Sequence, residues 1–243
     1  MDERRFLNEA QKTYTVPEDS FESKMSKYIV DTYNPYIMRG GIGLELGCAT
    51  GFSTNLYAPF FSELSVIEGS GEFMLIAREN VKYNNVRFRQ GLFEDISEVD
   101  KYDAIIANYV LEHIASPEVV IGKCYNALKK GGTLLVAVPN ALSLSRQMAV
   151  EMGLLDDIFA LTENDLNHGH RRVYDMKMLI NHITSSPFTV IKSGGVFIKP
   201  FASFQMMEMI KYGIIGEKQL DALVALAEKY PEISGTIYAI ARK

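Results

Sequence analysis

Short apolar runs alternate with amphipathic stretches along this chain, and this alternation restricts its fold more than any other feature of the sequence. Strands that alternate with helices form a mostly parallel sheet that helices cover on both faces. The pattern therefore predicts an α/β fold, and the length of 243 residues suits one domain over residues 1–243. The predicted strands are 42–47, 63–69, 86–91, 102–108, 132–140, 188–198 and 235–242, and the predicted helices are 18–33, 53–61, 72–83, 118–128, 176–184 and 217–230.

The net charge limits the kinds of binding partner that we expect, and the cysteine content indicates the cellular compartment. A net charge of −5 and a pI near 5.5 argue against a protein that holds nucleic acid on a basic surface. The N-terminal stretch lacks the apolar run of a signal peptide, and the apolar runs are too short to span a bilayer of roughly 30 Å. Cys48 and Cys124 fit reduced thiols. We expect a cytoplasmic protein without membrane insertion, as a monomer or homodimer.

Residues 141–175 interrupt the alternation of strands and helices between the fifth and the sixth predicted strand. In open parallel sheets, ligands bind outside the carboxyl ends of the strands, and the segments that follow those ends shape the site. The interruption is therefore predicted to be an insertion that caps a bound ligand.

The first predicted strand runs into the glycine loop "GLELGCATGF", residues 43–52. This loop is not the dinucleotide pattern G-x-G-x-x-G, because Ala49 takes the second glycine position and the third glycine is missing. It also lacks the lysine of a P-loop. Glu45 would repel a phosphate but can accept a hydrogen bond from an ammonium group, while Gly47 and Gly51 leave room for a nucleoside and an amino-acid tail. S-adenosylmethionine carries that combination without a phosphate.

The motif "ELGCATG" and the motifs after it resemble the class I S-adenosylmethionine-dependent methyltransferases. The matches cover about residues 40–140 in the family's order and spacing, and they include "NYVLEHIASP" and "LKKGGTLLVAVPN". The resemblance implies a Rossmann-like, doubly wound, seven-stranded and mostly parallel sheet whose last strand is antiparallel. It also implies a helical N-terminal lid at 1–38, a cofactor-binding core at 40–140 and an acceptor-side insertion at 141–175.

By the same resemblance, Glu68 at the end of the second strand bonds both ribose hydroxyls. Leu92 occupies the position at which many relatives have an aspartate. We therefore expect the backbone at 92 and 93 to bind adenine, and Glu94 to accept a hydrogen bond from its exocyclic amine. Tyr14 either folds over the cofactor or anchors the first helix on the sheet. The residues predicted to bind S-adenosylmethionine, or its product S-adenosylhomocysteine, are Tyr14, Glu45, Gly47, Cys48, Ala49, Gly51, Glu68, Gly69, Leu92, Phe93, Glu94, Asn108 and Tyr109.

The stretch "NDLNHGHRRVYD", residues 164–175, gathers side chains that suit a methyl acceptor. Histidine is the usual base near neutral pH, and arginine favours bidentate contacts with carboxylate or phosphate. A salt-bridged surface turn is the alternative interpretation. In "LEHIASP", Glu112 and His113 could place a base near the methyl group, but a role in closing the turn after the fourth strand or in shaping the cofactor site is preferred. The spacing D-x-x-H-x-H is too loose to predict a metal site. The candidate bases are His170, His168 and His113, in that order, and the candidate substrate-binding residues are Arg171, Arg172 and Tyr174.

The resemblance implies an enzyme that moves a methyl group from S-adenosylmethionine to an oxygen or nitrogen atom of a small polar acceptor. Similar "GHRR-x-Y" runs in methyltransferases linked to sugars favour a sugar-linked or phosphorylated acceptor, in carbohydrate or polysaccharide biosynthesis. A non-catalytic S-adenosylmethionine-binding partner or regulatory subunit is the alternative. A nucleotide-dependent oxidoreductase is a third interpretation, which the broken G-x-G-x-x-G pattern disfavours.

Overall fold

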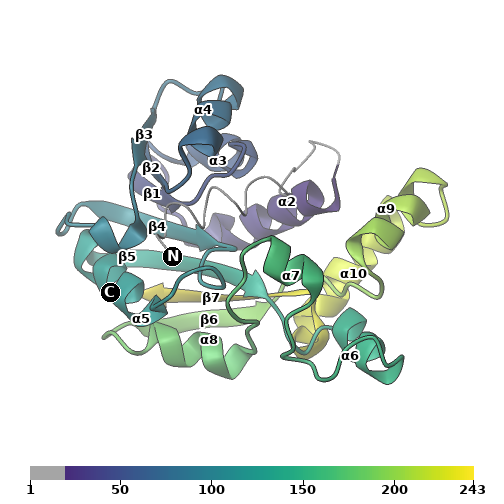
Figure 1. The fold of residues 1–243 in the computed structure, drawn as a ribbon. Coiled ribbons are helices and arrows are strands. Elements are labelled where there is room, and N and C mark those ends of the chain that lie inside the picture. Colours follow the sequence, from purple (N-terminus) through teal and green to yellow (C-terminus); the bar gives the residue numbers. More distant parts are fainter. Residues whose placement is uncertain (1–19) are drawn as a thin grey trace.

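The computed structural model describes residues 20–243 and confirms the predicted α/β architecture. Its sheet has the strand order β3-β2-β1-β4-β5-β7-β6, and β7 runs antiparallel to both of its neighbours while the other pairs are parallel. Figure 1 shows this seven-stranded sheet with helices packed around it. The strands are β1 (Ile42–Leu46), β2 (Glu63–Glu68), β3 (Val86–Gln90), β4 (Tyr102–Asn108), β5 (Leu128–Pro139), β6 (Thr189–Gly195) and β7 (Thr236–Arg242).

Each predicted strand and helix is present, with ends that move by a few residues. The structure adds three helices that the sequence did not predict, of which two lie in the insertion and one follows β6. The helices are α2 (Phe21–Tyr33), α3 (Phe52–Tyr57), α4 (Gly71–Asn80), α5 (Pro117–Ala127), α6 (Leu144–Glu151), α7 (Glu163–Asn167), α8 (Met176–Ile183), α9 (Ser203–Lys211) and α10 (Glu217–Lys229). Of these, α6, α7 and α9 are the added ones.

Both faces of the sheet are buried, and alternate residues of the central strands serve the two faces. On β5, Leu135 packs into the layer that contains α2, α3, α9 and α10, whereas Leu134 packs into the layer that contains α5 and α8. Ile240 and Ala241 divide in the same way on β7. A strand that is covered on both faces needs apolar residues at successive positions, which explains the continuous run "TLLVAV".

The described part of the predicted N-terminal lid contains a core helix, α2, and the role of residues 1–38 as a lid stays a prediction. Phe21, Ile29 and Tyr33 of α2 are almost fully buried, and Phe21 packs edge-on against Phe197 with ring centroids 5.5 Å apart. Burying three such side chains stabilises the fold by several kcal/mol, on the order of 2 kcal/mol each. Residues 1–19, which include Tyr14, lie outside the described residues.

The strand order reverses between β1 and β4, because the chain adds β2 and β3 on one side of β1 and the later strands on the other. In open α/β sheets, the crevice at such a switch point binds the ligand at the carboxyl ends of the strands. The loops after β1, β2, β3 and β4 meet there. Among residues 20–243, no helix has the length and apolar character needed to cross a membrane.

Candidate active site

The carboxylate of Glu68, at the end of β2, holds the glycine loop that follows β1. Its Oε2 accepts hydrogen bonds from the backbone N–H groups of Cys48 (3.0 Å) and Ala49 (3.2 Å), and its Oε1 accepts one from the backbone N–H of Ser70 (2.8 Å). Burial raises the pKa of Glu68, and these backbone hydrogen bonds oppose that rise. The acid that the sequence placed here therefore lies at the switch point and connects the loops after β1 and β2.

The Cys48 thiol also donates to Glu68 Oε2, at 3.8 Å, so four hydrogen bonds use the roughly four acceptor positions of the carboxylate. The prediction that Glu68 bonds both ribose hydroxyls therefore requires two of these donors, the thiol among them, to share or release their bonds.

Glu45 has a different environment from the one that the sequence suggested. Its two carboxylate oxygens accept hydrogen bonds from the hydroxyls of Ser53 and Thr54, each at 2.6 Å, and the residue is 2% exposed. Burial raises the pKa of Glu45 to about 7, although the two hydroxyl donors lower it. Glu45 thus anchors the first turn of α3 beneath the glycine loop, and its carboxylate does not face an open site where an ammonium group could approach directly.

The two glycines of the loop have separate structural roles. A Cβ on Gly47 would lie 3.4 Å from Val110 and 3.7 Å from Phe93, so the loops after β1, β3 and β4 converge at this residue. A Cβ on Gly51 would lie 2.9 Å from Val81 and 3.1 Å from the Cα of Ala77. The missing side chain of Gly51 is therefore required by the packing of α4, and its role in leaving room for the cofactor stays a prediction.

Two strained residues border the switch point. Ala49 has φ +44° and Tyr109 has φ +54°, and they are two of the three non-glycine residues with positive φ in the described chain. Such conformations cost about 1 to 2 kcal/mol and cluster at functional sites. Ala49 replaces the glycine usual in the resembling family, so the loop keeps a glycine-like conformation at that cost. The strained backbone therefore lies at the same edge of the sheet as the sequence motifs.

The remaining residues predicted to bind the cofactor lie around the same edge. Leu92 precedes a short 3-10 helix, Phe93–Asp95, and Gly69 follows β2. Asn108 donates a hydrogen bond from Nδ2 to the Tyr57 hydroxyl at 2.7 Å, whereas its buried Oδ1 has no hydrogen-bond partner among residues 20–243. Tyr109 pairs its hydroxyl with that of Thr236 at 2.9 Å. The roles of these residues, and of Glu94, in cofactor binding stay predictions.

A second group of polar side chains lies just beyond the end of β4. Glu112, His113 and His170 bring potential ligand atoms to within 4.8 Å of one another. The rings of His113 and His170 pack edge to face, with centroids 4.8 Å apart. Glu112 is 1% exposed, and neither of its carboxylate oxygens has a hydrogen-bond partner in the described part of the chain. We call these three residues the β4 cluster.

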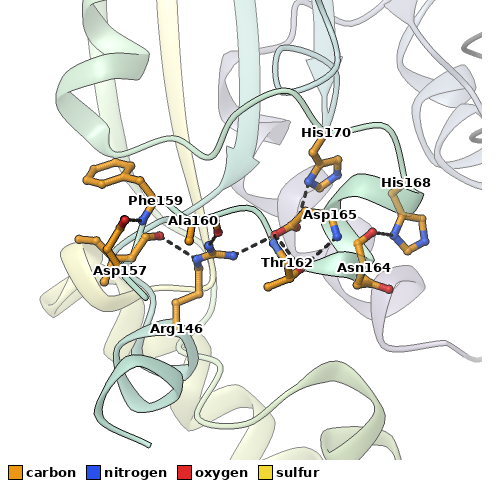
Figure 2. Close-up of polar contacts among 10 residues, drawn as sticks. Arg146, Asp157, Phe159, Ala160, Thr162, Asn164, Asp165, His168 and His170 are labelled. Carbon is orange, nitrogen blue, oxygen red and sulfur yellow. Dashed lines mark hydrogen bonds and ion pairs between the residues drawn. The ribbon is translucent and has the colours of Figure 1, made fainter. Parts of the chain in front are cut away.

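The insertion positions His170 through a partly buried ion-pair network, which Figure 2 shows. Asp165 lies between Arg146 and His170: its Oδ1 is 3.1 Å from His170 Nδ1, and its Oδ2 is 3.2 Å from the Arg146 guanidinium. Thr162 and Asp165 form a capping box at the start of α7, with the Asp165 N–H donating to the Thr162 hydroxyl at 3.0 Å. The network fixes the orientation of the His170 ring.

The electrostatic environment separates the two histidines of the β4 cluster. Burial, and after it the neighbouring His170, lower the pKa of His113 to about 4. Burial also acts to lower the pKa of His170, but the hydrogen bond to Asp165 and the charge of Glu112 outweigh it, so the pKa of His170 is raised. His170 is therefore the stronger base of the pair, and its role as the catalytic base stays a prediction.

His168 lies apart from the β4 cluster. Its Nδ1 is 2.8 Å from the backbone oxygen of Asn164, one turn earlier, so the ring closes the C-terminal end of α7 (Figure 2). Its ring centroid is 6.3 Å from that of His170. The structure gives His168 a helix-capping contact, and its proposed role as a base stays a prediction.

The predicted substrate residues Arg171, Arg172 and Tyr174 contact the loop after β4, and their role in binding an acceptor stays a prediction. Arg172 donates from its guanidinium to the backbone oxygens of residues 111, 114 and 115, and Arg171 Nε donates to the His113 oxygen at 2.7 Å. Tyr174 is fully buried and donates to the Leu111 oxygen at 3.3 Å. These residues close the loop after β4, because its carbonyl groups lie outside regular secondary structure and need donors.

The sequence indicated two possible roles for Glu112, in a turn or beside a base near the methyl group, and it did not indicate Asp165 or Arg146 as site residues. The pattern Thr162-x-x-Asp165 is the sequence form of a capping box and could have indicated that Asp165 begins a helix. Arg146 lies in a helix that the sequence did not reveal, so its approach to Asp165 depends on tertiary structure. For Glu112, the apolar residues beside it in the sequence are the only indication that its side chain is buried.

The unpartnered carboxyl of Glu112 leads to a prediction for stability. Burial raises the pKa of Glu112 to about 7, so the folded state binds a proton more tightly than the unfolded state. The folded protein therefore loses stability as pH rises from about 4.5 to about 7, by up to about 3 kcal/mol. The Glu112→Gln variant has no carboxyl group at this position and therefore lacks this loss. Its free energy of unfolding, relative to that of wild type, should rise from pH 5 to pH 8.

Urea unfolding of both proteins at pH 5 and pH 8, with a chelator present, measures this difference. Glu151→Gln, at the exposed end of α6, is the control for loss of a carboxylate on the surface. If the free energies of unfolding of Glu112→Gln and wild type differ by the same amount at pH 5 and pH 8, the prediction that burial raises the pKa of Glu112 is wrong.

Comparison with known proteins agrees with the site geometry. A family model described as "Methyltransferase domain" matches residues 21–192. A ubiquinone biosynthesis O-methyltransferase from Glaesserella parasuis is 30% identical over 105 residues, which are 40% of this chain and 44% of that protein. A malonyl-[acyl-carrier protein] O-methyltransferase from Priestia megaterium is 30% identical over 134 residues, 54% of this chain and 48% of that protein. The matches thus span about half the length of these curated relatives.

A solved structure shares the fold along its full length. The N-methyltransferase NodS from Bradyrhizobium japonicum, in complex with S-adenosyl-L-homocysteine, superposes with a TM-score of 0.62. The match covers 100% of this chain and 99% of that one, at 15% sequence identity. The likeness is one of fold, and it includes the seven-stranded sheet predicted from the sequence.

Proposed function

Because this chain belongs to the methyltransferase-domain family, whose cofactor is S-adenosylmethionine, we propose that it transfers a methyl group to an oxygen atom of a small polar acceptor. In this proposal, S-adenosylmethionine binds at the switch point, against the loop that Glu68 holds. The methyl acceptor binds on the side of the β4 cluster. Val110 supports this arrangement, since it touches the glycine loop and lies only two residues before Glu112.

The observation that carries the proposal is the His170–Asp165 pair beside Glu112. Methyl transfer is an in-line displacement at a carbon that the sulfonium already activates, so the protein mainly positions the acceptor. An acceptor hydroxyl must lose its proton, and His170 is the candidate that takes it. The O–H and C–S bonds break, the C–O bond forms, and S-adenosylhomocysteine leaves with the sulfur electron pair. An amine nucleophile needs no such base, which is why the cluster favours oxygen over nitrogen.

The relatives support an oxygen acceptor but do not identify it. The two curated relatives are named as O-methyltransferases, one of ubiquinone biosynthesis and one of malonyl-[acyl-carrier protein]. A sugar-linked or phosphorylated acceptor, in carbohydrate or polysaccharide biosynthesis, stays a proposal. Arg171 and Arg172 no longer support it, because their guanidinium groups contact backbone oxygens.

A labelled-donor assay tests the proposed activity. The protein is incubated with a metabolite extract and S-adenosylmethionine that carries an isotopically labelled methyl group, and the products are separated and identified. We expect label in a methyl ether or methyl ester. Label only in methylamines would refute the choice of oxygen. Binding of the donor without consumption in any extract would favour the alternative, a non-catalytic S-adenosylmethionine-binding subunit.

A further inference from the structure

We infer that Glu112, His113 and His170 form a binding site for a divalent transition-metal ion, on the acceptor side of the proposed active site. The three side chains come from the loop after β4 and from the insertion, which are far apart in the sequence. The spacing D-x-x-H-x-H within the insertion predicted no such site, because only His170 of that stretch belongs to this cluster. The remaining ligands come from the adjacent residues 112 and 113.

Each imidazole ring has one nitrogen beside an oxygen acceptor, as the rings of metal-binding histidines do. His113 Nδ1 is 3.2 Å from the Gly169 backbone oxygen, and His170 Nδ1 is 3.1 Å from Asp165 Oδ1. With Nδ1–H donating to those oxygens, each ring keeps a lone pair on Nε2. Metal-binding histidines characteristically donate their second N–H to a carboxylate or a backbone carbonyl, which fixes the tautomer and the ring orientation. The cluster contains one example of each kind.

Glu112 supplies the independent observation that a cation belongs here. Its carboxylate is buried, and both oxygens are without a hydrogen-bond partner within residues 20–243. A buried ionised carboxylate without a partner costs several kcal/mol. The nearby cation of Arg172 is engaged with three backbone oxygens of the same loop. A metal ion bound to the carboxylate would remove that cost.

The ligand set indicates the class of metal. Two imidazole nitrogens and one carboxylate oxygen suit zinc, iron, manganese or cobalt, whereas magnesium and calcium prefer oxygen ligands alone. Three protein ligands leave at least one position open for another molecule, as in catalytic zinc sites. Metal–ligand bonds are about 2.0 to 2.2 Å long, so the three atoms, now within 4.8 Å of one another, must draw together through side-chain rotation.

The role of this site rests on the proposed methyl transfer. A metal-bound hydroxyl loses its proton more readily, so an acceptor alcohol that takes the open position would become a nucleophile near neutral pH. The proton passes to solvent, and the oxygen then attacks the methyl carbon with loss of S-adenosylhomocysteine. With metal bound, His170 acts as a ligand, and without it His170 acts as the base.

Metal titration of the full chain tests the site without cofactor or acceptor, so its outcome is independent of methyl transfer. Protein freed of metal by a chelator is titrated with Zn²⁺ by calorimetry. Co²⁺ is added in a parallel experiment, in which visible absorption bands report nitrogen ligation. We expect one equivalent of Zn²⁺ to bind wild type. Glu112→Gln, His113→Ala and His170→Ala should each weaken binding by on the order of 100-fold.

His168→Ala is the matched control, because it removes a histidine from the same loop but from outside the cluster. Its Zn²⁺ affinity should stay within about twofold of wild type. Circular dichroism confirms that each variant is folded, and Glu112→Gln keeps the shape of the side chain in case an alanine variant fails to fold. Absence of binding by wild type, or equal binding by wild type and Glu112→Gln, would overturn the metal site and leave a cluster that handles protons alone.

Discussion

Glu68→Ala is expected to weaken S-adenosylmethionine binding by roughly 10- to 100-fold, about 1.5 to 3 kcal/mol. One contribution is the loss of the acceptor for the ribose. The other is the release of the backbone N–H groups of Cys48, Ala49 and Ser70, which hold the glycine loop in its strained conformation. Calorimetry measures the affinity, and unchanged binding would contradict the placement of the cofactor at this carboxylate.

Matched variants separate the two contributions. Glu68→Gln keeps an acceptor oxygen and the side-chain shape but removes the charge, so we expect an intermediate loss of affinity and a smaller loss of stability. Glu63→Ala, at the opposite end of β2, removes a carboxylate far from the carboxyl edge and should leave the affinity within about twofold. Glu68→Ala also leaves three backbone donors without their acceptor, which costs about 1 to 3 kcal/mol of stability if they stay buried.

His170→Ala is expected to reduce kcat by roughly 100-fold or more, because it removes the group that takes the acceptor proton. S-adenosylmethionine affinity should stay within about twofold, since the residue contacts the insertion and the loop after β4 but not the glycine loop. The assay uses the labelled methyl donor with the extract fraction that supports transfer. Full turnover in this variant would remove the β4 cluster from the reaction.

The pH dependence gives a second readout of His170. A base must be neutral to accept a proton, and the pKa of His170 is raised above its usual value of 6.5. Activity should therefore increase as pH rises through neutrality, and His170→Ala should lose that increase. His168→Ala should keep it, because that ring lies on the outer end of α7. If His170 binds metal, the Zn²⁺ titration separates loss of a ligand from loss of a base.

The strands and the acid at the switch point could be predicted from the sequence because local patterns determine them. The continuous apolar run of β5 indicates a strand covered on both faces, and the distance from Gly47 to Glu68 places an acid at the end of β2. The conformation of Ala49 could not be predicted from its side chain, since alanine rarely has positive φ. It follows from the hydrogen bonds to Glu68 and the packing of Gly51 on α4.

The acceptor side was predicted less well, because its contacts join distant segments. Arg171 and Arg172 suggested an anion site by residue type. In the structure their guanidinium groups donate hydrogen bonds to backbone oxygens of the loop after β4. Asp165 became important only through its contacts with Arg146 and His170. The pairing of Glu112 with His170 likewise depends on how the insertion folds back over the sheet edge. Residue type alone could not distinguish a clamp from a closure of the loop.

Calorimetric titration of the purified chain with S-adenosylmethionine, S-adenosylhomocysteine and NAD⁺ tests the central claim most directly, which is that the switch point binds the methyl donor. We predict that both sulfur compounds bind with one equivalent each, that Glu68→Ala weakens both, and that NAD⁺ does not bind. Binding of NAD⁺ with no binding of S-adenosylmethionine would contradict the account.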